Sequence, residues 1–381
     1  MSSVTITTDQ TTIYVRTARY DPIVVQACKS VAGARAKWSK YVSSSTGGQE
    51  KGVFDAWTYS ATPASAGAIA LAMRNAGITV TGDDAYLKLV VEAAVADGIA
   101  STTDDNAFEP LPRVRFKQWS NQRRGSQMIL KQRATMLAWD MGTGKTKGVI
   151  DATNHMPGLR KMLILCPQSV VDVWEREFEK HSMIEYRMAA LGEGDTTWRL
   201  KEAKRVAALA ERTKKTFILV LNFEAFIREA LADWILDQEW DMAVVDESHR
   251  IKDPQGVTSK TISRLTPIAH TRVCLTGTPM PHSPMDVFGQ YRFLDPGIYG
   301  GSWTAFRAKY ATMGGYQNHQ IVGYQNLDDL HKRFYSIAHR VSKEDVLDLP
   351  EAVHEVRYVT LGSKAMAMYK QLESDFITQV N

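Results

Sequence analysis

One segment of the sequence combines glycines with a lysine and a hydroxyl residue in the order that phosphate binding requires. Gly142-Thr143-Gly144-Lys145-Thr146 directly follows an apolar run. Glycines let backbone amides turn inward around a triphosphate, and a helix that begins near Lys145 would direct free N–H groups at the same anion. We expect Gly142, Thr143 and Gly144 to cradle phosphates, Lys145 to contact the β- and γ-phosphates, and Thr146 to ligate Mg²⁺.

The loop departs from the strict form of this motif at one position. Where that form has its first glycine, this chain has Trp139. The match is therefore to the shorter core of the motif. A glycine-containing helix start without a ligand is the alternative interpretation.

Two adjacent carboxylates form the second candidate site. Asp246 and Glu247 follow the apolar run Met242–Val245, and His249 comes two residues later. Buried carboxylates are costly unless they hold a cation or a proton in transit. Asp246 suits the Mg²⁺ shell, Glu247 suits polarising the water that attacks the γ-phosphate, and His249 can hydrogen-bond to another motif. The alternative is a helix N-terminus with favourable acids.

Weaker signals surround these two motifs. Thr276 and Thr278, after another apolar run, offer hydroxyls that could sense the γ-phosphate near Asp246, although a plain Gly-Pro turn explains them too. Upstream, the amide of Gln122 could pair with the edge of adenine and the ring of Trp119 could stack on its face. Most glutamines at helix starts have no such role.

A repeating pattern of apolar runs and helical segments explains how these residues could lie close together. Short apolar runs alternate with helical patterns at Thr135–Trp139, Met162–Cys166, Phe217–Leu221, Met242–Val245 and Arg272–Leu275. This alternation predicts an α/β fold with a parallel sheet that is covered by helices on both faces. Because ligands of such sheets bind at the carboxyl ends of the strands, the motifs above would share one edge.

Bulk properties set broad limits. The net charge of +4 is too small to indicate a polyanion partner. Residues 113–133 hold seven basic and no acidic residues, a run that fits phosphate contacts or a solvated face equally well. The three cysteines lack metal or CxxC spacing, which indicates reduced thiols. With no signal peptide and no membrane span, we expect a cytoplasmic protein, or a nuclear one in a eukaryote.

A different pattern precedes the α/β segment. Residues 1–97 are expected to form a small α+β module, with strands at Thr12–Val15 and Val53–Ser60 and helices at Asp21–Val31 and Pro63–Asn75. Residues 98–112, which are rich in Asp and Pro, are predicted to be a linker.

The ordered motifs together resemble the Swi/Snf-type branch of superfamily-two helicase-like ATPases. The resemblance covers residues 113 to 375 and rests on WSNQRRG, AWDMGTGKT, LILCPQSVVDVWEREFEKH, ILVLNFEAF, VVDESHRIKDPQGVTSK, CLTGTPMPHSPMDVFGQYRFLDPG, SWTAFRAKY and AHRVSKEDVLDLPEAVHEVRYVTL. It implies that Gln122 contacts adenine, that Asp246 and Glu247 carry hydrolysis, and that Thr276 and Thr278 link the nucleotide to the DNA track.

Two departures from the branch leave the phosphate and Mg²⁺ ligands in place. Trp139 and Asp140 stand where the branch usually has two acids, and Ser248 replaces the usual alanine.

The N-terminal residues carry a shorter likeness. Tyr20-Asp-Pro-Ile-Val-Val, Val31-Ala-Gly-Ala-Arg35 and Trp57 are similar to the HARP-like module that contacts branched DNA in annealing-helicase relatives. The tryptophan expected after Gly-Ala-Arg comes late, at Trp38. A small structural cap is the alternative interpretation.

The resemblance divides the rest of the chain and implies a missing part. Residues 113–298 would be the first RecA-like lobe, and residues 299–381 a helical extension and connector to a second lobe. That lobe, which supplies an arginine finger, would act in cis or in trans. Because the sequence shows no such motif, we expect a fragment that binds ATP and Mg²⁺ but hydrolyses ATP weakly alone.

The implied function is an ATP-dependent translocase or helicase-like motor that acts on duplex or branched DNA, with a role in DNA repair. Two alternatives remain open: a motor part of a restriction or RNA-remodelling system, and a regulatory DNA-binding protein that no longer hydrolyses ATP.

Overall fold

The computed structural model describes residues 2–41, 51–315, 317, 320–346, 355 and 358–380. Residues up to 346 form one compact unit, and residues from 347 onward form a second. The second unit contains helix α16 (Ser363–Val380). The predicted connector falls partly on residues 347–354 and 356–357, outside the described residues.

The first unit begins with a small α+β module. Its strands are β1 (Ser3–Thr8), β2 (Thr12–Arg16), β3 (Arg35–Tyr41), β4 (Lys51–Ser60) and β5 (Thr79–Gly82), and its helices are α1 (Pro22–Ser30), α2 (Pro63–Asn75) and α3 (Asp84–Ser101). The strands form one sheet in the order β3-β4-β2-β1-β5. All neighbouring pairs are antiparallel except β1 and β5.

Alternation along the strands buries one face of this sheet. In β1, Val4 and Ile6 are buried while Ser3 and Thr5 are exposed, and they pack with apolar residues of the three helices. Helix α1 begins where the sequence predicts, because the carboxylate of Asp21 accepts hydrogen bonds from the backbone N–H groups of Ile23 and Val24.

The predicted linker at residues 98–112 contains two helical stretches. Helix α3 continues to Ser101, and the short helix η1 (Asp105–Ala107) follows. Phe108 is buried against Ile99 and Met128, so apolar packing onto the next helix holds the segment in place.

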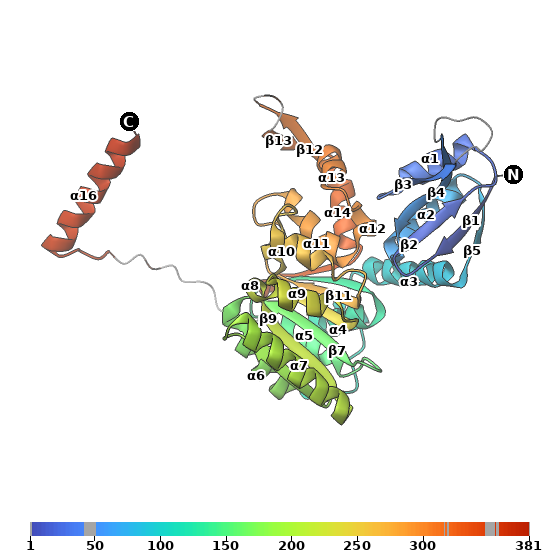
Figure 1. Cartoon of the computed structure of the whole chain (residues 1–381). Helices are drawn as coiled ribbons and strands as arrows, with labels where there is room; N and C mark the ends of the chain where they lie inside the picture. Colours follow the sequence, from blue (N-terminus) through green and yellow to red (C-terminus); the bar gives the residue numbers. More distant parts are fainter. Residues whose placement is uncertain are drawn as a thin grey trace. The chain divides into compact units, whose positions relative to one another are not determined.

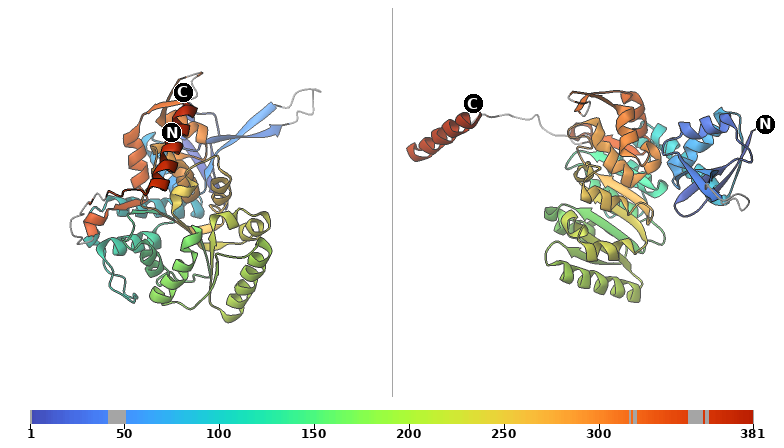
Figure 2. Two further views of the ribbon diagram at one scale, coloured as in Figure 1. Left: turned by 90° about the vertical axis from the view of Figure 1, so that its left-hand side faces the viewer. Right: turned by 45° about the horizontal axis from the view of Figure 1, so that its top comes forward.

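The rest of the first unit is built on a seven-stranded sheet (Figures 1 and 2). Its strands are β6 (Ala134–Trp139), β7 (Lys161–Cys166), β8 (Tyr186–Leu191), β9 (Thr216–Asn222), β10 (Trp240–Asp246), β11 (Ala269–Leu275) and β14 (Ala338–Val341). They lie in the order β14-β6-β11-β10-β7-β9-β8, and every pair is parallel. The predicted α/β fold with a parallel sheet is confirmed.

Helices cover both faces of this sheet. The helices of this part of the chain are α4 (Ser120–Lys131), α5 (Lys145–Thr153), α6 (Val171–His181), α7 (Thr196–Thr213), α8 (Phe223–Phe226), α9 (Glu229–Leu236), α10 (Val257–Ser263), α11 (Val287–Leu294), α12 (Pro296–Tyr299), α13 (Trp303–Tyr310), α14 (Leu327–Tyr335) and α15 (Lys343–Val346). Alternate strand residues enter two separate cores. One core contains residues of α5 and α6, and the other contains residues of α7, α9 and α11.

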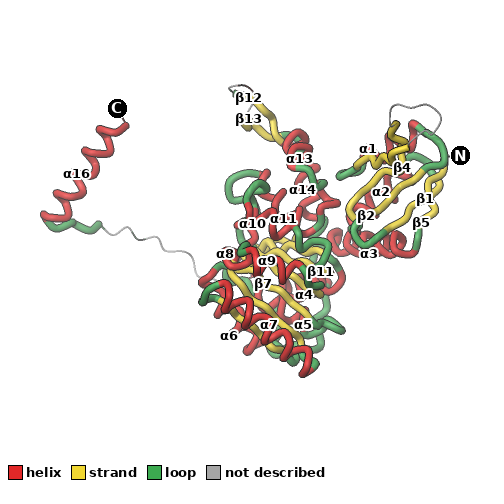
Figure 3. Tube along the Cα trace, in the orientation of Figure 1, coloured by secondary structure: helices red, strands yellow, loops and turns green. Residues whose placement is uncertain are grey.

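The segment after residue 298 is not purely helical, which corrects the predicted helical extension. Strands β12 (Ala311–Gly314) and β13 (Gln320–Tyr324) form a separate antiparallel pair (Figure 3). Strand β14 joins the large sheet beside β6. Its four residues include His339 and Arg340, so it has no apolar run to reveal it, and pairing with β6 stabilises it instead.

No helix among the described residues is long and apolar enough to cross a membrane.

Close packing around α11 gives a test of the fold. A Cβ atom at Gly289 would collide with the backbone carbonyl oxygen of Ile251. We therefore expect Gly289→Ala to lower the free energy of unfolding by about 1–3 kcal/mol in urea denaturation. Gly98→Ala is the matched control: no atom lies within 4 Å of its added Cβ, and it should raise stability by about 0.5–1 kcal/mol. Equal stability of Gly289→Ala and the unaltered protein would contradict this packing.

Candidate nucleotide-binding site

The predicted phosphate loop lies between the carboxyl end of β6 and the first turn of α5. Gly142 and Gly144 have φ angles of 85° and 84°. This left-handed region is costly for residues with a Cβ, so both positions require glycine. Lys145 and Thr146 begin α5, where the backbone N–H groups have no partner within the helix. The backbone is therefore shaped to receive an anion.

Side chains of helix α4 pack against this loop and hydrogen-bond to it. A Cβ at Gly144 would collide with the side-chain amide of Gln122, so the buried Gln122 fills the space that the glycine leaves. Its Oε1 accepts a hydrogen bond of 3.1 Å from the backbone N–H of Trp119. Asn121 Nδ2 donates to the carbonyl of Thr143 at 3.1 Å. The indole of Trp119 is 43% exposed.

Side chains inside the loop tie its two ends together. Lys145 Nζ donates to the carbonyl oxygens of Trp139 at 2.7 Å and Asp140 at 3.1 Å. The hydroxyl of Thr143 also donates to the Asp140 carbonyl, at 2.8 Å. The backbone N–H of Thr143 points to the same carbonyl, at 3.5 Å, so both donors of Thr143 have a partner within the loop.

The acidic pair lies close enough to Lys145 to affect its charge. Burial lowers the pKa of Lys145, while the negative charges of Glu247, Asp246 and Asp140 oppose that shift. The sequence motifs at β6 and β10 therefore meet at one edge of the sheet, as predicted from strand direction.

Asp246 is the most strongly perturbed carboxylate of this edge. It ends β10, is 6% exposed, and accepts hydrogen bonds from Trp174 Nε1 at 3.0 Å and from the backbone N–H of Glu247 at 2.9 Å. Burial raises its pKa to about 6, although the Trp174 hydrogen bond and the charge of Lys145 oppose the shift. A cation placed beside Asp246 would restore its ionised form.

Glu247 carries backbone strain. Its φ of 50° and ψ of 51° place a non-glycine residue in the left-handed region. Such a conformation costs on the order of 1–3 kcal/mol and persists only where surrounding contacts enforce it.

A histidine joins the acidic pair to the next strand. His249 Nδ1 lies 3.1 Å from Thr276 Oγ1 and 3.2 Å from Glu247 Oε2. Thr276 Oγ1 also accepts a hydrogen bond of 3.1 Å from the backbone N–H of Thr278. Burial lowers the pKa of His249, against the charge of Glu247. His249 thus lies between Glu247 and the turn after β11 and contacts both.

Sequence comparison with known protein families identifies the family of this chain. The chain matches the model of the SNF2-related domain over residues 38–381. The chain belongs to the SNF2-related family.

Three curated relatives illustrate the match. The chain is 30% identical over 265 residues to the TATA-binding protein-associated factor MOT1 of Saccharomyces cerevisiae, covering 63% of this chain and 13% of MOT1. It is 29% identical over 252 residues to the ISWI chromatin-remodeling complex ATPase ISW2 of the same yeast, covering 65% and 21%. It is 28% identical over 280 residues to the DNA annealing helicase and endonuclease ZRANB3 of Homo sapiens, covering 71% and 25%. The chain spans a quarter or less of the length of each.

Among solved structures, the SWI2/SNF2 ATPase core of Sulfolobus solfataricus in complex with dsDNA aligns with a TM-score of 0.49 and 24% identity. The alignment covers 70% of this chain and 54% of that one.

Trp174 and Gln290 make contacts at this site that no sequence motif indicates. The indole of Trp174 donates a hydrogen bond to Asp246. Ser248 Oγ donates to Gln290 Oε1 at 2.7 Å, and Gln290 Nε2 donates to the carbonyl of Pro279 at 2.7 Å. Gln290 therefore makes a second link between the acidic pair and the turn after β11. Neither contact has a sequence signal, because each joins separate elements.

The donor set fits a hard divalent cation held mainly through phosphate. Thr146 and Asp246 supply hydroxyl and carboxylate oxygens, which Mg²⁺ prefers. Within the part of the chain that the structure describes, no group of three or more His, Cys, Asp or Glu residues gathers. A bound Mg²⁺ would therefore take its remaining ligands from phosphate oxygens and water.

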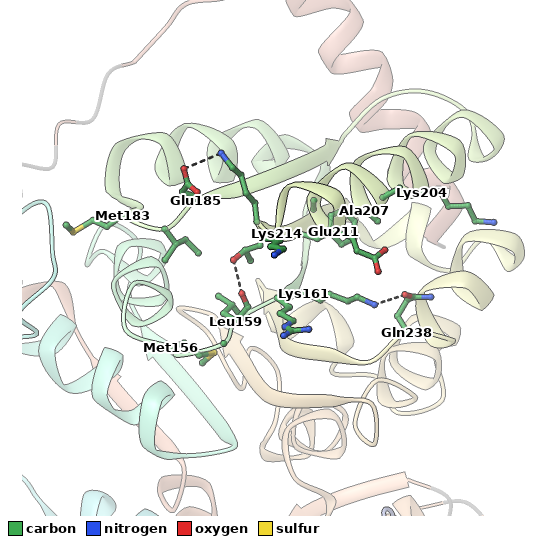
Figure 4. Close-up of a pocket in the computed structure, with 18 of the residues that line it drawn as sticks. Met156, Leu159, Lys161, Met183, Glu185, Lys204, Ala207, Glu211, Lys214 and Gln238 are labelled. Atoms are coloured by element: carbon green, nitrogen blue, oxygen red, sulfur yellow. Dashed lines mark hydrogen bonds and ion pairs between the residues drawn. The ribbon is translucent and has the colours of Figure 1, made fainter.

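A large cavity lies elsewhere in the part of the chain that the structure describes (Figure 4). It has a volume of about 1240 Å³, and its lining includes Lys161 and Thr216, where β7 and β9 begin. None of the predicted site residues lines it. Since ligands of parallel sheets bind at the carboxyl ends of the strands, the phosphate loop and not this cavity remains the candidate nucleotide site.

The raised pKa of Asp246 predicts a pH-dependent stability. In the folded protein its proton is held up to a pH of about 6, whereas the unfolded chain releases it near 3.8. Its contribution to stability is therefore fully present below 3.8 and is lost as the pH rises through 6. We expect Asp246→Asn to gain up to about 3 kcal/mol relative to the unaltered protein between pH 4 and pH 7.

The pH dependence separates this effect from a lost hydrogen bond, which would shift stability equally at every pH. Urea denaturation of both proteins at pH 4, 5, 6 and 7 measures it. Asp233→Asn, at an exposed position on α9, is the matched control and should show no such trend. A constant difference for Asp246→Asn across this range would show that Asp246 has an ordinary pKa.

Proposed function

We propose that this chain is the ATP-binding lobe of a DNA-stimulated motor that uses ATP hydrolysis to translocate on or remodel duplex or branched DNA. One observation carries the proposal. A glycine loop with Lys145 and the acidic pair Asp246–Glu247 lie together at one edge of a parallel sheet, in a member of the SNF2-related family. Phosphoryl transfer requires this combination of anion cradle, cation and carboxylates.

In this proposal the loop residues bind the triphosphate. The backbone amides of Gly142, Thr143 and Gly144 donate to phosphate oxygens, and Lys145 exchanges its carbonyl partners in the loop for the β- and γ-phosphates. Thr146 and Asp246 would hold Mg²⁺, which supplies neutralisation of the phosphate charge when bound.

Glu247 orients and polarises the attacking water. The strained backbone at Glu247 fixes its side chain beside His249, which links it to Thr276. The state of the γ-phosphate would thus reach the turn that holds Thr278, the segment expected to couple to the DNA track. Gln122 would pair with adenine and Trp119 would stack on it; the exposed indole supports the second role.

Two further parts of the proposal rest on the family resemblance. A second RecA-like lobe, in cis or in trans, would supply an arginine finger worth about 10³ to 10⁵ in rate, so turnover by this chain alone would be slow. The resemblance to the annealing-helicase branch supports branched DNA as the substrate, with the N-terminal module as an additional contact and DNA repair as the context.

Substituting the proposed base tests the chemistry. We expect Glu247→Gln to lower single-turnover ATP hydrolysis about 100-fold or more, because the amide cannot accept a proton from water, while ATP affinity changes little. Glu229→Gln, at an exposed position on α9, is the control and should retain the original rate. Excess protein over radiolabelled ATP makes the slow reaction measurable. A rate unchanged in Glu247→Gln would refute the assignment.

The nucleic-acid partner is tested in the same assay. Duplex DNA should accelerate hydrolysis more than RNA, and the effect should weaken steeply with salt, since phosphate contacts release counterions. Equal acceleration by RNA would favour an RNA-remodelling motor. A chain that binds DNA but no ATP would favour the regulatory alternative.

A further inference from the structure

Trp139 stands at the entrance of the phosphate loop and is completely buried. Two glycines make room for its ring. A Cβ at Gly125 would lie 2.6 Å from the indole Cη2 and Cζ2 atoms, and one at Gly148 would lie 3.6 Å from Cη2. The indole is therefore held between α4 and α5, the helices that flank the loop.

The indole N–H starts a chain of hydrogen bonds. Trp139 Nε1 donates to His339 Nδ1 at 3.1 Å, across 200 positions of sequence. His339 Nε2 lies 3.1 Å from Asp105 Oδ1, which also accepts from Arg124 Nη1 at 3.0 Å. Since Nδ1 accepts, the imidazole donates from Nε2 to the carboxylate, and this fixes one neutral tautomer of His339.

Asp105 is the fixed end of this chain. Burial disfavours its charge, but the hydrogen bonds from His339 and Arg124 and the charge of Arg124 prevail and lower its pKa. The carboxylate is therefore ionised at neutral pH and can accept both donors. Its position in η1, outside the large sheet, connects the segment after α3 to the strand β14 that carries His339.

The other end of this series of hydrogen bonds reaches Lys145, the lysine proposed to bind phosphate. The carbonyl oxygen of Trp139 accepts a hydrogen bond of 2.7 Å from Lys145 Nζ. The next residue, Asp140, donates its N–H to the carbonyl of Val341 at 3.0 Å and accepts from the Lys343 N–H at 3.1 Å. The backbone N–H and the carboxylate of Asp140 are therefore anchored to β14 and to the residues that follow it.

A buried tryptophan with a hydrogen-bonded N–H is common in protein cores. Substitution of such a residue is expected to lower stability without changing ligand affinity. Here the same residue presents the indole to an oriented histidine and the carbonyl to Lys145. We propose that Asp105, His339 and Trp139 form a positioning chain that sets the phosphate loop for nucleotide binding. The proposal rests on the ATP-binding function proposed above and adds three residues to it.

The test measures affinity for a non-hydrolysable ATP analogue, AMP-PNP with Mg²⁺, by titration calorimetry on the full chain. His339→Leu removes the acceptor and leaves the indole N–H unpaired, and we expect affinity to fall about tenfold. His339→Gln can accept from the indole and donate to Asp105, so it should restore affinity to within about threefold. His331→Leu, at an exposed position on α14, is the matched control and should bind normally.

Coupling between the two residues provides the second measurement. Trp139→Phe should weaken binding about as much as His339→Leu, and the double variant should be no weaker than either, because both remove the same hydrogen bond. If His339→Leu does not fold, Trp139→Phe alone carries the test. Melting temperatures measured without nucleotide separate an affinity effect from a general loss of stability.

The outcomes distinguish this inference from the function on which it rests. If the unaltered protein binds no AMP-PNP, both fail. If it binds, and His339→Leu and Trp139→Phe lower only the melting temperature while affinity stays the same, the positioning chain is refuted and ATP binding stands. Equal losses in His339→Gln and His339→Leu would also refute it, because they show that hydrogen bonding is not the cause.

Discussion

The parallel direction of all seven strands is the constraint on which the candidate site depends. Parallel strands deliver their carboxyl ends to one edge, so three motifs that are spread along the sequence from Gly142 to Thr278 meet there. Strand β11 lies between β6 and β10, which places Thr276 between the loop that holds Lys145 and the acidic Asp246. A change in strand order would separate these groups even with the same residues present.

The same edge concentrates charges that would be costly one at a time. Burial works against the charged forms of both Lys145 and Asp246, and each partly offsets the cost of the other. The strain at Glu247 adds to that cost. These buried charges and this backbone strain lower the stability of the folded protein. A bound polyanion would pair with Lys145, and its cation would pair with Asp246. This is the physical reason to expect function here.

The sequence predicted the interior of the large sheet well and its edges poorly. β6, β7, β9, β10 and β11 were recognised because strands buried on both faces read as continuous apolar runs. The edge strands β8 and β14 were missed because they are short or carry polar residues, as edge strands commonly do. In the N-terminal module, β1, β3, β5 and α3 were not predicted either.

For the site, the loop glycines and the acidic pair could be predicted from local motifs, and the structure places them together. The roles assigned to them stay predictions. What local sequence could not reveal are contacts between distant elements, such as Trp174 with Asp246, Gln290 with Pro279, and His339 with Trp139. Each depends on packing that exists only after the chain has folded.

The buried carboxylate of Asp295 limits how far this protein can be divided. It lies 3% exposed, caps α12 through the N–H of Gly297 at 2.8 Å, and accepts from the N–H of Ala64 in α2 at 3.4 Å. Gly297 permits this approach, since a Cβ there would lie 2.6 Å from the backbone nitrogen of Ser65. Cutting the chain after α3 would therefore uncover a carboxylate and a helix end that the first hundred residues now shield. The N-terminal module therefore covers part of the lobe's surface at α12.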